Sequence, residues 1–87
     1  MPYIKKDKRI ELDLNLQNVS FVLGSADIGA LNYCITKLCL NFLSRTEKRY
    51  VDYNAIIGAV ESAKLELYRR AVSTYEDTKI QENGDVY

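Results

Sequence analysis

The most regular pattern of apolar positions lies in the middle of the chain. Ile28, Leu31, Ile35, Leu38 and Phe42 recur every three or four residues, the spacing that places side chains on one face of an α-helix. Further apolar residues between them widen this stripe. The pattern therefore predicts a helix over residues 27–44 that is buried on more than one side, with Ser25 or Asp27 as its N-cap.

A second helical pattern follows the short charged connection TEKRYVDY. The helical period continues through its apolar positions, which are Ile56, Val60, Ala63, Leu67, Tyr68, Val72 and Tyr75. Asn83-Gly84 then stops the helix, because glycine readily adopts the left-handed conformation. We expect a long helix over residues 52–82 with Asp52 as N-cap and a tail over 83–87. The short connection predicts that this helix and the preceding one are antiparallel neighbours.

The first segment carries two competing patterns. Ile10, Leu12, Leu14 and Leu16 alternate as in a strand, whereas Leu12, Leu16, Val19 and Leu23 step as in a helix. The longer helical run ends at Gly24, so we predict an extended arm over residues 1–12 and a helix over 13–23. The expected fold is all-α: a single domain over 1–87 with an N-terminal arm and helix followed by a long antiparallel helical hairpin. Because so short a chain buries little surface, we expect a homo-oligomer.

Charge and composition limit the partners and the cellular location that we expect for the protein. The net charge is zero, which disfavours nucleic acid as a partner. Charge is nevertheless uneven, with +3 over the first ten residues and −3 from Ala71 onward. No long apolar run is present, so neither a signal peptide nor a membrane span is expected. Cys34 and Cys39 are five apart on one predicted helix and cannot bridge, which favours buried, reduced thiols in a cytoplasmic protein.

The residue types that catalysis usually needs are sparse. The chain has no histidine, and two thiols five residues apart are not a metal motif. The stretch GSADIG lacks the spacing and the lysine of a phosphate-binding loop, so an ordinary turn and helix cap is the favoured interpretation, with an anion held at the helix start as the alternative. We therefore expect no enzyme activity, no cofactor and no metal.

The tyrosines give a more specific signal. Seven of the 87 residues are tyrosine, whose ring and polar tip suit interfaces and stacked ligands. Arginine and lysine nearby would supply donors for phosphate. This combination is what a nucleotide needs, so the candidate ligand-binding residues are Tyr33, Lys37, Lys64, Tyr68, Arg69, Arg70 and Tyr75. The alternative is that the tyrosines seal a subunit interface while the arginines pair with Glu66, Glu76 or Asp77.

Several stretches resemble a family of small helical proteins from phages, prophages and bacteria. They are MPYIKK, LNYCITKL, IIGAVESAKLELYRR and YEDTKIQENGDVY. The resemblance implies a fold and a context rather than an activity. By form alone, the chain is also similar to phage anti-defence sponges for cyclic nucleotides.

Three hypotheses of function follow. The first is a non-enzymatic phage anti-defence protein that sequesters a nucleotide-type immune signal, either a cyclic oligonucleotide or a molecule like cyclic ADP-ribose, at a subunit interface. The second is a small oligomeric interaction module that binds a host or phage protein through its acidic C-terminal tail. The third, less favoured, is a DNA-binding regulator that uses the basic arm, with affinity that falls steeply with salt.

Overall fold

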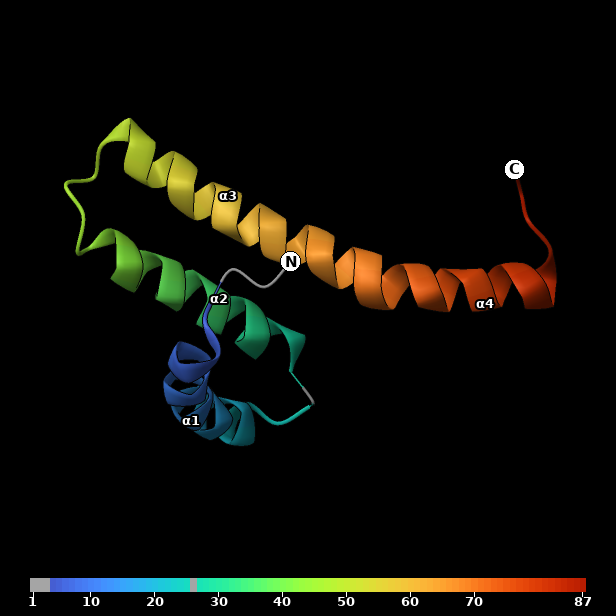
Figure 1. Cartoon of the computed structure of the whole chain (residues 1–87), viewed down its shortest axis with the longest axis horizontal. Helices are drawn as coiled ribbons and strands as arrows, with labels where there is room; N and C mark the ends of the chain where they lie inside the picture. Colours follow the sequence, from blue (N-terminus) through green and yellow to red (C-terminus); the bar gives the residue numbers. More distant parts are fainter. Residues whose placement is uncertain (1–3, 26) are drawn as a thin grey trace. The chain divides into compact units, whose positions relative to one another are not determined.

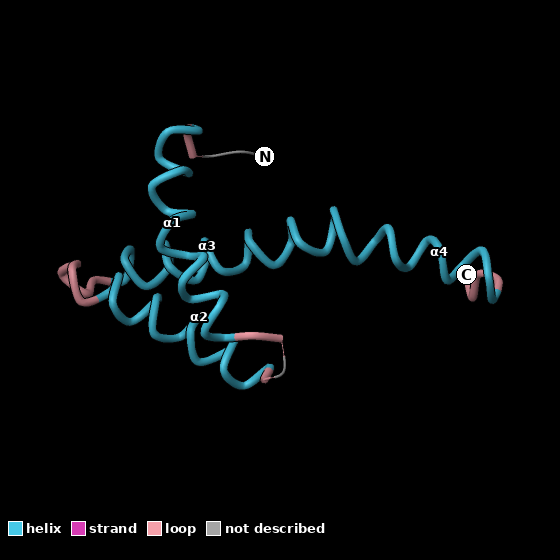
Figure 2. The backbone as a smooth tube through the Cα atoms, turned by 90° about the horizontal axis from the view of Figure 1, so that it is seen from below, coloured by secondary structure: helices cyan, strands magenta, loops and turns pink. Residues whose placement is uncertain are grey.

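The computed structural model describes residues 4–25 and 27–87, and this part of the chain contains helices and loops but no strand (Figures 1 and 2). The all-α prediction is therefore confirmed. The helices fall into two compact units, residues 1–45 and residues 46–87, which are described separately.

The first helix, α1 (Lys6–Leu23), is longer than predicted. The expectation of an extended arm over residues 1–12 is wrong for residues 6–12, and residues 1–3 lie outside the described part. Lysine, arginine, glutamate and leucine, which dominate this stretch, all have high helix propensity, and this propensity outweighs the alternating pattern. Gly24 ends α1 with φ +65°, and its N–H donates to the carbonyl of Ser20 at 3.1 Å.

The second helix, α2 (Ile28–Leu43), begins at a side-chain cap. The Asp27 carboxylate accepts hydrogen bonds from the N–H groups of Gly29 and Ala30 at 2.9 and 3.2 Å. Of the two predicted caps, Asp27 is thus the one used. Because its carboxylate already occupies these N–H groups, the alternative of a bound anion at this helix start is not supported.

Residues 46–87 form one continuous helical run with a change of type in the middle. It comprises α3 (Tyr50–Leu67), the π-helical turn η1 (Tyr68–Val72) and α4 (Ser73–Asn83). The ribbon passes from α3 to α4 without a break (Figure 1). In η1 the Ser73 N–H donates to the Tyr68 carbonyl five residues back, where an α-helix would use a carbonyl four residues back.

The ends of this run agree only partly with the sequence. Asp52 is not the N-cap: that position is Arg49, and the Asp52 side chain instead accepts a hydrogen bond from the Arg49 N–H at 3.0 Å. At the other end Gly84, with φ +82°, donates to the Ile80 carbonyl at 2.8 Å, as predicted for a glycine stop. The helical run thus covers residues 50–83 rather than 52–82.

No side chain in the described part of the chain is buried. The prediction that residues 27–44 are buried on more than one side is therefore not met by the single chain: Leu31 and Ile35 keep 42% and 43% of their surface exposed. Cys34 and Cys39 are free and half-buried. Since apolar burial is the main stabilising term in folding, these helices have much apolar surface left to cover.

Candidate functional site

The candidate binding residues divide between the two units. Tyr33 and Lys37 belong to α2, and the Lys37 ammonium lies 6.0 Å from the centre of the Tyr33 ring. The other five residues belong to the long helical run of the second unit. We therefore treat the candidates as two separate clusters.

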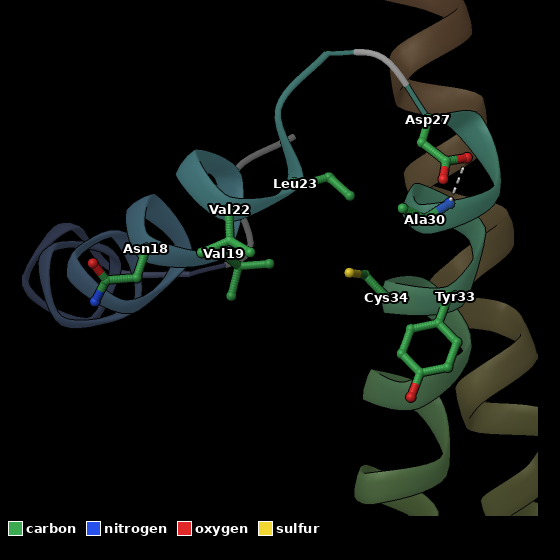
Figure 3. Close-up of a pocket in the computed structure, with 8 residues that line it drawn as sticks. All are labelled: Asn18, Val19, Val22, Leu23, Asp27, Ala30, Tyr33 and Cys34. Atoms are coloured by element: carbon green, nitrogen blue, oxygen red, sulfur yellow. Dashed lines mark hydrogen bonds between the residues drawn. The ribbon is translucent and has the colours of Figure 1, made fainter.

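Tyr33 also lines an open, mostly apolar pocket of about 610 Å³ within the first unit. Figure 3 shows the pocket between the end of α1 and the start of α2, with Leu23 and the thiol of Cys34 pointing toward each other across it. Val19, Val22 and Ala30 complete its apolar lining. A pocket of this kind suits an apolar group, and Asp27, the only charged residue in the described part of its lining, would repel a phosphate.

In the second unit, η1 holds the central cluster. Glu66, in the last turn of α3, accepts hydrogen bonds from both arginines: Arg69 Nη2 donates at 3.2 Å and Arg70 Nε at 3.0 Å. The spacing of three and four residues is the one that brings side chains together on a helix. The pairing of the arginines with Glu66, the alternative raised by the sequence, is therefore present.

This arrangement leaves the cluster positively charged. Two guanidinium groups share one carboxylate, and each guanidinium has five N–H donors. The side chains of Arg69 and Arg70 keep 63% and 64% of their surface exposed, and Tyr68 beside them keeps 52%. Donors and an aromatic ring thus remain available to solvent or to a ligand.

The remaining candidates have local partners of their own. The Lys64 ammonium pairs with Glu61 at 3.3 Å, and Tyr75 has the Lys79 ammonium 5.6 Å from its ring centre. Tyr68 also lines an open groove of about 510 Å³ that runs along α4 to the C-terminal tail. Sequence reasoning did not include Lys79 or the tail residues in this site, although the spacing of four between Tyr75 and Lys79 was a usable signal.

Protonation of Glu66 provides a test of the arginine cluster. The hydrogen bonds from Arg69 and then Arg70 are the largest causes that lower the pKa of Glu66 to about 2. Because this pKa is lowered, the interaction is fully present above pH 4.5, the ordinary value for glutamate, and is lost as the pH falls through about 2. We expect an NMR titration of the Glu66 carboxyl to give a midpoint near 2, returning toward 4.5 when both arginines are changed to alanine. A midpoint near 4.5 in the unmodified protein would show that the arginines do not hold Glu66.

Comparison with known proteins identifies a family. The chain matches the family described as Domain of unknown function (DUF6899) over residues 1–86. It is a member of that family. No curated protein and no solved structure matches the chain.

Two further properties of this DUF6899 protein bear on its chemistry. None of the helices within residues 4–25 and 27–87 combines the length and apolar character needed to cross a bilayer. The same residues contain no group of three or more cysteine and acidic side chains arranged to hold a metal ion.

Proposed function

We propose that this protein binds and sequesters a nucleotide-type anion, without chemical conversion, as a homo-oligomer. The observation that carries the proposal is the π-helical turn η1, which presents Tyr68, Arg69 and Arg70 together with most of each side chain exposed. Short π-helical segments within α-helices occur frequently at functional sites. A ring beside two guanidinium groups is the set of groups that binds a base and its phosphates.

The charge of the cluster supports the same ligand class. One carboxylate, Glu66, offsets only one of the two arginine charges, so a phosphate finds a net attraction there. It can bind the unused N–H groups of both guanidiniums or replace Glu66 as their partner. Tyr68 lines the groove of about 510 Å³, and its ring would stack on the base.

The biological role proposed here is that of a phage anti-defence sponge for a cyclic oligonucleotide or a molecule like cyclic ADP-ribose. The absence of histidine from the sequence supports binding over catalysis, and the resemblance to proteins of phages and prophages supports the context. The antiparallel hairpin of the helices predicted over residues 27–44 and 52–82, and the homo-oligomer, remain predictions that belong to this proposal.

A release assay tests the function directly. Purified protein is incubated with a panel of cyclic di- and trinucleotides and cyclic ADP-ribose isomers, and free ligand is measured after filtration, before and after heat denaturation. We expect one ligand to disappear and to return intact on heating. Altered products would show an enzyme, and no loss across the panel would overturn the nucleotide proposal.

A second function is favoured by the C-terminal tail. Beyond Gly84 the chain leaves the helix, and Val86 and Tyr87 are almost fully exposed. Asp85 accepts a hydrogen bond from the Tyr87 N–H at 3.0 Å, which gives the tail a defined turn. These residues could form an acidic, aromatic motif for a protein partner. A variant without residues 81–87 tests this second function, because a partner protein that recognises the tail would no longer bind to the protein in a pull-down.

A further inference from the structure

The π-helical turn changes which side chains line up along the helical run of the second unit. Eighteen residues make five full turns of an α-helix, so an uninterrupted α-helix would place Thr74 directly in line with Ile56. A π turn holds about one residue more than an α turn. With η1 present, Tyr75 takes that place instead of Thr74.

The result is one apolar stripe that continues from α3 into α4. It contains Ile56, Val60 and Leu67 before η1, Val72 at the end of η1, and Tyr75 after it. Val60, Leu67 and Tyr75 keep 40%, 64% and 60% of their surface exposed. At 1.5 Å per residue, the helical run is about 50 Å long, whereas the 16 residues of α2 span only about 24 Å. α2 is therefore too short to cover the whole stripe.

The charges beside this stripe indicate what covers it. Each residue of an α-helix turns the chain by about 100° around the helix axis, and η1 holds one residue more than this regular turn requires. Measured from Ile56 in this way, Lys64 lies at about 80° and Glu76 at about 100°. Both side chains are therefore on the same flank of the stripe. Glu61 and Lys79 lie on that flank too. Lys64 and Glu76 are equally far from residue 70 along the chain, on opposite sides of it. The same holds for Glu61 and Lys79.

In an antiparallel pair of identical helices, a flank of one faces the same flank of the other. We infer that two copies of this chain pair antiparallel through α3, η1 and α4, about a two-fold axis at Arg70. Lys64 then faces the partner's Glu76, and Glu61 faces the partner's Lys79. A parallel pair would place residues of equal number at the same level and would lose both combinations.

The existing ion pairs of these residues do not oppose this arrangement. Lys64 pairs with Glu61 at 3.3 Å and Lys79 with Glu82 at 3.1 Å, all four within one chain and largely exposed. Exposed ion pairs of this kind contribute little to stability and exchange partners readily. The charges are thus available to a second copy.

The position of the two-fold axis also has a consequence for the kind of ligand that binds. This consequence rests on the proposed function. Arg70 of both copies comes close to the axis on one flank, so two clusters with an excess of positive charge meet there. Their repulsion is relieved by an anion between them. The site would therefore favour a ligand with two phosphates related by two-fold symmetry over a mononucleotide.

Charge reversal tests the pairing independently of any ligand. We expect Lys64→Glu and Glu76→Lys, each alone, to raise the dimer dissociation constant about tenfold or more, measured by analytical ultracentrifugation. The double variant should have the dimer dissociation constant of the unmodified protein, because the exchanged charges again face each other. Failure of the double variant to restore pairing, or a monomeric wild-type protein, would overturn the inference.

A distance measurement tests the direction of the pair. A spin label at Gln81→Cys, in a Cys34→Ala and Cys39→Ala background, lies away from the stripe. An antiparallel pair separates the two labels by at least about 33 Å along the helix, whereas a parallel pair keeps them within about 25 Å, given helix axes about 10 Å apart. The short distance would contradict the inference. If the pairing holds but no ligand binds, the proposed ligand binding fails and the pairing stands. If a monomer binds ligand, the pairing and the homo-oligomer fail, and the proposed ligand binding stands.

Discussion

Replacing Arg69 and Arg70 together by alanine is expected to lower the affinity for the sequestered ligand at least a hundredfold. Hydrogen bonds between charged groups contribute about 1.5–3 kcal/mol each, and the double variant removes one such donor group at each of two positions. The helix should persist, because both side chains are largely exposed and alanine has the highest helix propensity. Equilibrium dialysis with the ligand found in the release assay gives the affinity, and circular dichroism gives the helix content.

Arg49→Ala is the matched control for this experiment. Arg49 is also an exposed arginine paired with a glutamate, Glu47, at 3.1 Å, but it stands before α3 and outside the proposed site. We expect its affinity to equal that of the unmodified protein. Normal binding by the Arg69→Ala, Arg70→Ala protein would show that η1 is not the ligand site. A loss of binding in the control as well would point to a general effect of charge.

Single-residue deletions in the long helix should have opposite effects on pairing, depending on their position. Deleting Ala71 removes the extra residue of η1, so that a plain α-helix keeps Tyr75 in line with Ile56. Pairing should survive. Deleting Ala63 instead turns Ile56, Val60 and Glu61 by about 100° relative to the rest of the stripe and its flanking charges. We expect the dimer dissociation constant of the second variant to rise by about a hundredfold, measured by analytical ultracentrifugation.

Both variants lose one alanine from the same helix, so their difference reports on side-chain alignment rather than on length. Circular dichroism should show similar helix content for the two. Equal pairing by both variants would contradict the role of η1 as a register correction. The Ala71 deletion also removes the π-helical turn itself, so a dimer that no longer binds ligand would tie the turn to the binding site.

Much of the fold could be predicted from local chemistry. The cap at Asp27, the stop at Gly24 and the stop at Gly84 each depend on the residue type at one position and its own backbone. The start of α1 at Lys6 was missed because an alternating apolar pattern competed with high helix propensity, and only the propensity proved decisive. The N-cap was predicted at Asp52, three residues after its actual position at Arg49. A carboxylate can accept hydrogen bonds from backbone N–H groups at a helix start either from the N-cap or from the first turn, and Asp52 does so from the first turn.

The candidate site was less accessible to sequence reasoning. The spacing of Glu66 to Arg69 and Arg70 was sufficient to raise their pairing as an alternative. The π-helical turn was not predicted, because its five residues, YRRAV, carry no residue type that an α-helix would exclude. The effect of η1 on the alignment of the apolar stripe depends on residues one to three turns away on both sides of it. A local sequence pattern cannot reveal this effect.

The absence of buried side chains from the described part of the chain has a consequence for the amount of protein that a cell must make. In the proposed dimer, association would supply much of the stability that the single chain lacks, so the stability would depend on the concentration of the protein. Dilute chains would be unfolded and open to proteolysis, whereas concentrated chains would protect one another. The level of active protein would then rise more steeply than the rate of synthesis, giving a threshold in expression below which the protein does nothing.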